Sequence, residues 1–306
     1  MRKQLLAVTA LTLGFAGLAQ AQETPITPSR SSEYYHAPAA GVNELTIHGG
    51  YALGTVRAEG ANAVDTDING ARNLGVEWVY GISDMFKVGA DISYTTLSVD
   101  NGVTDTKNSG IEPIVLKGSG NLPLGAGTLV YGLRAQFAVE KAKTEANGDQ
   151  NRTIGDVLSN VGEGGFELAP WVGYSMLLGQ SHNLGAKLSY EVVNTDTDVE
   201  GPNGTEETLS GGSEGRASVF YEYLLSDMPL GVALNYDWYT AIDTETNGIE
   251  TEALDARSMI GVDLYTRINA GNWGILPTLS WREKASSDQF DKLSDVRLNI
   301  AGRFAF

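Results

Sequence analysis

This chain of 306 residues has little or none of several residue types, and each shortage excludes a class of protein. It has no cysteine, which rules out disulfide frameworks, thiolate catalysis and cysteine-ligated metal sites. It has three histidines, so few side chains can serve as the base that lipases, proteases and deacylases require. Its formal net charge is -17, and this acidic balance argues against nucleic-acid binding.

Long apolar segments are also scarce. The run from Leu5 to Leu18 is too short to span a bilayer, and it lies between two basic residues and Ala19-Gln20-Ala21. This order is typical of a cleaved secretory signal peptide, so we expect residues 1–21 to be removed and the mature chain to begin at Gln22. Prolines punctuate segment 22–42, which we expect to form an irregular N-terminal periplasmic tail or a short plug.

The strongest positive signal is the alternation of apolar and polar residues, which is clearest in residues 296–306. Apolar residues recur there at every second position with polar or small residues between them, which is the period of a strand with one apolar face. The apolar face ends on the terminal residue, Phe306. A soluble protein seldom exposes a terminal aromatic residue, whereas a strand that faces lipid can end in one.

This stretch resembles the C-terminal strand of Gram-negative outer-membrane β-barrel proteins, in which a terminal Phe after alternating apolar residues acts as the assembly signal. The resemblance assigns that role to Phe304 and Phe306. It implies a porin-like, all-β fold: a transmembrane antiparallel up-and-down β-barrel whose partners are outer-membrane lipids, lipopolysaccharide and the barrel-assembly machinery. The alternative interpretations are an ordinary edge strand and, for the whole chain, a soluble all-β sandwich.

The same alternation recurs through residues 43–306 and predicts about twelve strands. An even number places both chain ends on the periplasmic side. Short turns, one of them at Asn121-Leu122-Pro123, alternate with long polar loops that face the exterior in such barrels. Pro113 interrupts the strand expected near 111–118. The long loops are expected at 57–71, 98–109, 141–165, 194–214, 241–256 and 284–294.

Charged residues also fall on the inward faces of the expected strands, where acids and bases nearly balance. The excess of acidic residues is then expected in the external loops. We expect the lumen to be lined by Glu77, Lys87, Asp91, Arg134, Gln136, Glu140, Glu167, Lys187, Glu191, Arg216, Glu222, Asp237, Asp263, Arg267, Arg282, Arg297 and Arg303.

One acidic loop has the spacing of a calcium-binding loop, in which alternate oxygens surround the cation and a distal Glu closes the site. The pattern D-x-D-x-[acid]-G-x5-E is matched by Asp196, Asp198, Glu200, Gly201 and Glu207. Strands rather than helices are expected beside it, and Glu200 is longer than the usual Asp or Asn. The sequence leaves open a calcium site formed by the four acids or a solvated acidic loop, and no other cofactor is expected.

Together these features favour a passive, porin-like channel for small hydrophilic solutes in the outer membrane. Barrels of about eight strands are filled and those of roughly 16 to 18 are open, so one of about twelve could be either. One alternative is a structural or adhesive surface barrel that presents its acidic loops. Another is an outer-membrane enzyme, which no constellation supports, because we expect His36, His48 and His182 to be solvated or interfacial.

Overall fold

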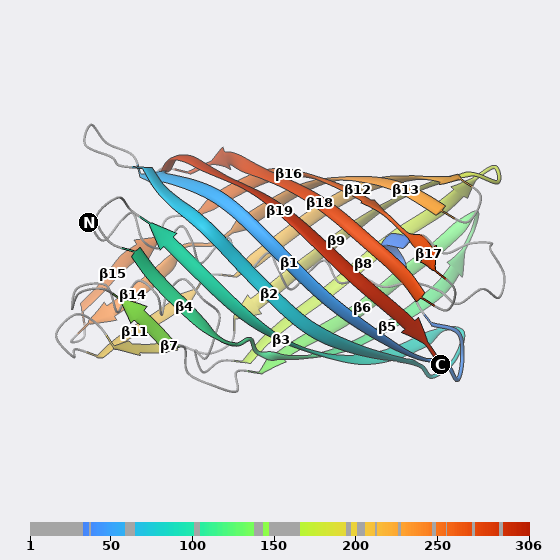
Figure 1. Cartoon of the computed structure of the whole chain (residues 1–306), viewed down its shortest axis with the longest axis horizontal. Helices are drawn as coiled ribbons and strands as arrows, with labels where there is room; N and C mark the ends of the chain where they lie inside the picture. The colour runs from blue at the N-terminus through green and yellow to red at the C-terminus, as the bar shows by residue number, and fades with distance from the viewer. Residues whose placement is uncertain are drawn as a thin grey trace.

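The structure, a computed structural model, is a closed antiparallel β-barrel with twelve strands in its wall (Figure 1). This confirms the predicted up-and-down barrel. The structure describes residues 33–36, 38–58, 65–100, 105–137, 143–146, 166–193, 197–200, 206–211, 213–225, 228–246, 249–254, 256–270, 273–287 and 290–306. The wall strands are β1 (Asn43–Ala58), β2 (Asp65–Gly81), β3 (Phe86–Asp100), β5 (Ile114–Leu124), β6 (Gly127–Phe137), β8 (Phe166–Leu178), β9 (His182–Val193), β12 (Glu214–Leu225), β13 (Met228–Tyr239), β16 (Arg257–Thr266), β18 (Trp273–Ser286) and β19 (Phe290–Ala305).

Each wall strand pairs with its neighbour along the chain, and the last strand closes the ring on the first. The β1 and β19 ladder begins where Glu44 faces Ala305, and after a register shift beyond Arg57 it ends at the pair Ala58 and Phe290. Beyond it, the backbone groups of Asn43 and Phe306 exchange two hydrogen bonds of 2.8 and 3.0 Å. Closure of this kind leaves no open sheet edge in the wall.

The wall has two contrasting faces because side chains alternate along its strands. Outward side chains are apolar and exposed, for example Leu74 at 63% and Ile300 at 52%. Inward neighbours are polar or charged and buried, for example Arg297 at 3%. A continuous exposed apolar belt is unfavourable in water and favourable against hydrocarbon, so the outer surface matches a bilayer and the inner surface a polar lumen.

The short connections and the C-terminus lie at one end of the barrel, which we call the turn end; the opposite end is the loop end (Figure 1). The prediction of a turn at Asn121-Leu122-Pro123 is wrong, because β5 continues through these residues to Leu124. The connection to Gly127 has two residues, and Gly125 at its first position has φ of 60°. A left-handed residue suits a tight hairpin, and glycine adopts it without steric penalty.

At the loop end the strands extend further than the sequence indicated. Pairing of β1 with β2 reaches Arg57 and Asp65, so residues 65–71 of the loop expected at 57–71 are strand. The loops expected at 194–214 and 241–256 contain a small sheet whose strands follow one another as β10, β11, β14 and β15. Polar residues on both faces hide such strands from a search for one apolar face. Their bounds are β10 (Thr197–Glu200), β11 (Glu206–Gly211), β14 (Ile242–Thr246) and β15 (Ile249–Leu254).

The interruption expected at Pro113 is present. β4 (Asp105–Ile111) and β5 both pair with β3, and Glu112 and Pro113 separate them. Proline has no N–H for the ladder, and the Glu112 carboxylate accepts hydrogen bonds from the hydroxyl groups of Ser93 and Thr95 on β3. Two short strands, β7 (Lys143–Ala146) on β4 and β17 (Ile268–Ala270) on β18, extend the sheet. Within the described ranges, no helix is long and apolar enough to cross a membrane.

Candidate functional site

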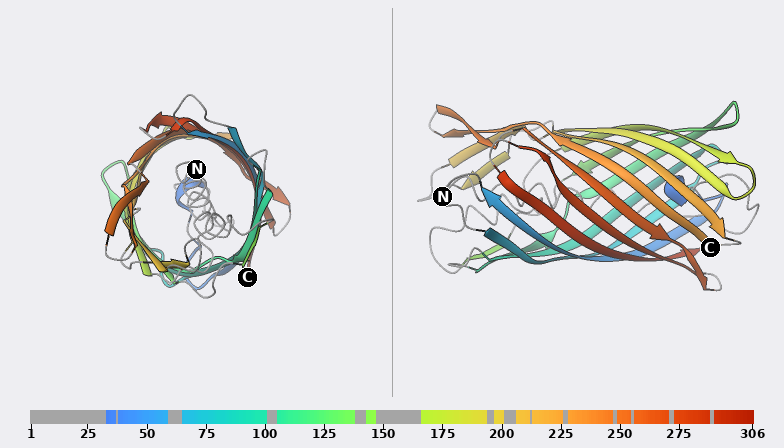
Figure 2. Two further views of the ribbon diagram at one scale, coloured as in Figure 1. Left: turned by 90° about the vertical axis from the view of Figure 1, so that its left-hand side faces the viewer. Right: turned by 90° about the horizontal axis from the view of Figure 1, so that it is seen from above.

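An N-terminal segment lies in the lumen, and we call its described residues, 33–36 and 38–42, the plug. It is tied to the wall at the turn end, where the Gly41 N–H donates to the Gly81 carbonyl at 2.7 Å and the Gly81 N–H donates to the Val42 carbonyl at 3.1 Å. Its 3-10 turn η3 (Glu33–Tyr35) sits inside the ring of strands (Figure 2). The turn and His36, which belong to the expected tail 22–42, are therefore inside the barrel, and residues 38–42 connect them to the wall at the turn end.

Two plug residues contact one side of the lumen through aromatic rings, and we call this the aromatic side. The Tyr34 ring stacks on Phe220 with centroids 4.5 Å apart, and the Tyr35 ring packs edge-on against Phe220 at 5.3 Å. Tyr35 also lies parallel to Trp171 at 6.1 Å, and its hydroxyl donates to the Ala186 carbonyl. Burial raises the pKa of Tyr34 to about 12, so its phenol is neutral at physiological pH.

The next plug residue contacts a different part of the wall, which we call the polar side. His36 Nε2 lies 3.0 Å from Glu44 Oε2, and the His36 carbonyl accepts a hydrogen bond from Lys87. Glu44 also pairs with Arg303, with 3.1 Å between Oε1 and Nε. Burial, helped by the positive charges of Arg303 and Lys87, lowers the pKa of His36 well below its ordinary range. The imidazole is therefore neutral and can donate its Nε2 proton to Glu44.

The plug spans the lumen between these two sides. Tyr34 and Tyr35 touch β8, β9 and β12, and the Tyr34 ring also lies 6.1 Å from that of Tyr265 on β16, whereas His36 touches β1 and β3. In the ring, these two groups of strands are separated by β18 and β19 on one path and by β5 and β6 on the other. Three consecutive residues thus contact separate parts of the wall and occupy part of the lumen.

Ion pairs hold the inward face in place beside the plug. Arg216 pairs with Asp237, and Arg282 pairs with Asp263 at 2.7 Å while approaching Asp237 at 3.4 Å. These four residues come from β12, β13, β16 and β18, so the network joins adjacent strands across the wall. Buried charges of this kind remain tolerable only while their partners are present.

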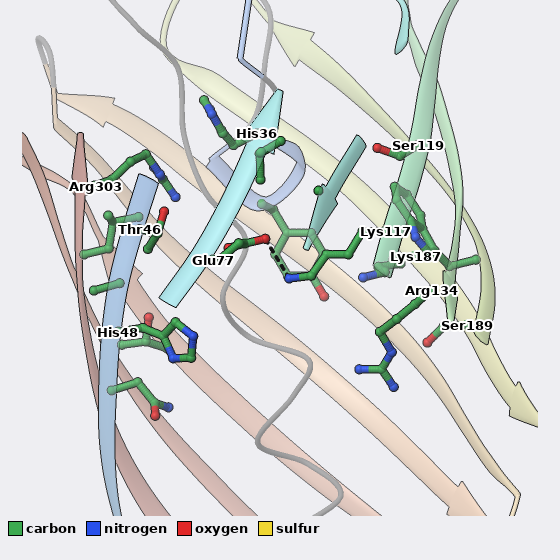
Figure 3. A pocket seen from close by; sticks show the side chains of 18 of the residues that line it. His36, Thr46, His48, Glu77, Lys117, Ser119, Arg134, Lys187, Ser189 and Arg303 are labelled. Carbon is green, nitrogen blue, oxygen red and sulfur yellow. Dashed lines mark hydrogen bonds and ion pairs between the residues drawn. The ribbon is translucent and has the colours of Figure 1, made fainter. Parts of the chain in front are cut away.

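Between the plug and the wall is a cavity of about 200 Å³ (Figure 3). Its rim contains more basic than acidic side chains, although the chain as a whole is acidic. The basic ones are Lys87, Lys117, Arg134, Lys187, Arg216 and Arg303, and the acidic ones are Glu77, Glu191, Glu214 and Asp263. Lys117 Nζ donates to Glu77 Oε1 at 2.6 Å, which is the contact drawn as a dashed line in Figure 3.

The structure places the expected lumen residues on the inward face wherever it describes them. Those brought together around the cavity are Glu77, Lys87, Arg134, Lys187, Glu191, Arg216, Asp263 and Arg303. Those found elsewhere on the inward face are Asp91, Gln136, Glu167, Glu222, Asp237, Arg267, Arg282 and Arg297. Glu140 lies outside the described residues. Phe304 and Phe306 stack on each other at the turn end with centroids 5.8 Å apart, and their role in assembly stays a prediction.

The proposed calcium ligands do not form one loop. Asp198 and Glu200 belong to β10 and Glu207 belongs to β11, where it is the ladder partner of Val199. The turn between these strands and Asp196 lie outside the described residues. A hairpin replaces the single wrapped loop that the spacing suggested, and across the described residues no group of three or more His, Asp or Glu is placed to hold a metal ion. Calcium binding here stays a prediction.

Sequence reasoning missed the aromatic side of the lumen. Trp171 and Phe220 occupy inward positions of β8 and β12. The alternation expects polar or small residues at these positions, so large aromatic residues there are a departure from the pattern that could have revealed the aromatic side. A second signal is Gly185, where an added Cβ would collide with the Phe220 ring. Glu214 was expected in the acidic loop 194–214 but begins β12 and is buried, because the strand starts earlier than its apolar face.

The expectation for two of the histidines is wrong. His36 is buried in the lumen, because the segment that carries it folds into the barrel. His48 also points inward, and its Nε2 lies 3.0 Å from Asp91 Oδ2. His182 is exposed at the turn end, with Nδ1 2.7 Å from the Tyr221 hydroxyl, as an interfacial residue would be.

Comparisons with known proteins identify the fold. No family model and no curated protein sequence matches the chain. An outer membrane channel from Pseudomonas putida F1 has a TM-score of 0.65 at 14% identity, over 91% of this chain and 100% of that one. The transport unit of the autotransporter AIDA-I from Escherichia coli has a TM-score of 0.57 at 10% identity, over 99% of each chain. A deletion mutant of the monoaromatic hydrocarbon channel TodX has a TM-score of 0.52 at 8% identity, over 87% of this chain and 91% of that one. The chain has the fold of Gram-negative outer-membrane β-barrels.

Proposed function

We propose that the protein is a passive outer-membrane channel for small hydrophilic solutes, and that the plug narrows its lumen. The observation that carries this proposal is the lumen itself, which keeps buried ion pairs and a cavity of about 200 Å³. Replacing buried ion pairs by well-packed apolar side chains is often neutral or stabilising. A barrel that served only as an anchor would gain from such filling, whereas a passage for polar solutes needs charged walls.

The plug fits a narrowed channel because it fills only part of the lumen. It crosses between the aromatic side and the polar side, and the cavity remains beside it. Its described side chains are held by ring contacts and hydrogen bonds, which can break without unfolding a wall strand. The plug therefore provides a way to control the passage while the barrel stays intact.

Liposome swelling tests the proposal. Proteoliposomes that carry the refolded protein should swell in an isotonic solution of arabinose and much less in one of stachyose, because the narrowed lumen passes only small solutes. Liposomes that carry the same protein unfolded by heat provide the control. The absence of arabinose-driven swelling, in both the natural protein and the Tyr34→Ala/Tyr35→Ala variant, would contradict a channel.

Location in the outer membrane follows from the same proposal. The fold and the exposed apolar belt support it, and removal of residues 1–21 remains a prediction because these residues lie outside the described ranges. Intact mass of the protein extracted from outer-membrane fractions tests both points. The expected mass corresponds to a chain that begins at Gln22. That the protein is not an enzyme also remains a prediction.

A second candidate is a surface barrel that presents its loop end to other cells or molecules. The observation that favours it is the four-stranded sheet of β10, β11, β14 and β15, which extends two hairpins beyond the wall (Figure 1). This sheet is built from loops rich in acidic residues. Deleting residues 197–211 should leave arabinose-driven swelling unchanged if the barrel is a channel. A natural protein that gives no swelling, and whose surface adhesion is lost on this deletion, would favour the anchor.

A further inference from the structure

The basic side chains of the cavity are concentrated on one part of its wall. Lys117 on β5, Arg134 on β6 and Lys187 on β9 lie together in Figure 3. The positive charges of Arg216, Arg134, Lys87 and Lys117 all act on Lys187. Like charges gathered in a partly enclosed space raise one another's energy, and an anion placed among them relieves that repulsion. Glu77 pairs with Lys117 and Glu191 pairs with Arg134, which balances part of this charge. The cavity lining still holds more basic than acidic side chains and therefore favours an anionic occupant.

Aromatic rings stand directly beside this cluster. Lys187 Nζ lies 4.9 Å from the centre of the Trp171 ring and 6.0 Å from that of Tyr34. Both rings line the cavity, and Ala169 and Leu276 add apolar surface to it. Small-molecule sites typically combine a mainly apolar wall with a few polar groups that fix orientation. An occupant that matches both parts has a charged end and a flat apolar body.

We propose that this cavity binds a small carboxylate with an aromatic or similarly flat apolar body. The carboxylate would lie among Lys117, Arg134 and Lys187, and the body against Trp171 and Tyr34. Arg134 has further guanidinium N–H donors beyond the one that binds Glu191, and Lys117 has further ammonium protons beyond the one that binds Glu77, which suits two carboxylate oxygens. This inference rests on the proposed function and deepens it, because it names the class of solute that the passage would select.

Direct binding to the refolded protein in detergent tests the inference without requiring conduction. Isothermal titration with three probes separates the contributions: benzoate has both parts, benzyl alcohol has the ring without the charge, and acetate has the charge without the ring. We expect benzoate to bind at least about ten-fold more tightly than either of the others, since a charge-assisted hydrogen bond contributes about 1.5–3 kcal/mol. Benzyl alcohol or acetate that binds as tightly as benzoate would overturn the inference.

Matched variants locate the site. Lys187→Gln should weaken benzoate binding about ten-fold or more, Lys187→Arg should preserve it, and Lys292→Gln should leave it unchanged. Lys292 is exposed near the loop end, so its replacement makes the same change in net charge away from the cavity. Equal losses in Lys187→Gln and Lys292→Gln would overturn the inference. If Lys187→Gln does not fold, the three-probe comparison on the natural protein still decides.

The same samples distinguish failure of the inference from failure of the proposed function. Arabinose-driven swelling without preferential benzoate binding would leave a channel but refute this solute class. Preferential benzoate binding without swelling would support the site and contradict the channel.

Discussion

The outward and inward faces of the wall are made of adjacent residues, yet they meet opposite solvation requirements. On β19, Ile300 is exposed and apolar, whereas Arg297 and Arg303 on the other face are buried and charged. The outward face has the apolar composition of a protein core although it is exposed, because lipid rather than neighbouring side chains is its apolar partner. The inward face carries the charges, the plug and the cavity. The comparison shows that the outward residues of each strand suit the barrel to a lipid environment, while the inward residues set the chemistry of the lumen.

The largest expected effect comes from placing the same charge on each face in turn. Ile300→Asp puts a carboxylate in the lipid-facing belt and should abolish insertion, whereas Ala301→Asp faces the cavity and should be tolerated. Phe306→Asp should also strand the chain in the periplasm, if the terminal residue is part of the assembly signal. The yield of folded protein in outer-membrane fractions measures each effect. Equal yields for Ile300→Asp and Ala301→Asp would break the comparison between the faces.

A smaller loss is expected when the ion-pair network loses a member. Arg282→Met leaves Asp237 and Asp263 without their shared partner and should destabilise the barrel by about 3–5 kcal/mol. Lys292→Met removes an exposed charge and should have almost no effect. The temperature at which the folded band disappears in semi-native gel electrophoresis provides the measurement. If the Arg282→Met variant unfolded at the same temperature as the Lys292→Met control, the network would not stabilise the wall.

The polar side of the plug should be sensitive to acid. His36 is neutral in the lumen because its pKa is lowered, whereas a released plug would expose it with an ordinary pKa near 6.5. The released state then binds more protons below about pH 6.5, so acid favours release, by up to about ten-fold per pH unit until the lowered pKa is reached. The surrounding charges are Glu44 on β1, Lys87 on β3, Arg303 on β19 and Arg267 after β16.

Single-channel open probability between pH 7.5 and 5.0 tests this expectation. His36→Gln cannot titrate and should remove the rise on acidification, while His182→Gln on the outside should retain it. A rise of equal size in His36→Gln would assign the pH response to other groups.

The smallest effect should come from one hydroxyl on the aromatic side. Tyr35→Phe removes the hydrogen bond to the Ala186 carbonyl but keeps the ring, which should weaken plug docking by about 1 kcal/mol, or about five-fold. Tyr221→Phe removes an exposed hydroxyl on the outward face and should not change docking. Limited proteolysis near Tyr35 measures release of the plug. Equal cleavage rates in the two variants would indicate that this hydrogen bond does not hold the plug.

The wall was predictable from the sequence, whereas the sequence left residues 22–42 as either a periplasmic tail or a short plug, and the reason is physical. Two-residue alternation reports which solvent each side chain meets, so Val296 to Phe306 and the similar segments before it identify the strands and their faces. The plug has no such period. Tyr34 and Tyr35 belong to a single 3-10 turn, and its position depends on contacts with residues far along the chain. One of them is Glu222, 188 positions away, whose Oε1 accepts a hydrogen bond from the Tyr34 N–H at 3.0 Å. Strands with two polar faces, such as β10 and β11, are not predicted from the sequence for a related reason, because they have no apolar face that would give a two-residue pattern.

The central claim is that the lumen is a passage narrowed by the plug, and single-channel conductance of the chain with and without residues 22–40 tests it most directly. Both proteins should be refolded, inserted into planar bilayers and compared at one salt concentration. The account predicts that the full mature chain conducts in small steps and that removal of residues 22–40 raises the conductance several-fold while the barrel remains folded. If neither chain conducts although both insert, the lumen is closed by its own wall, and the account of this protein as a channel is contradicted.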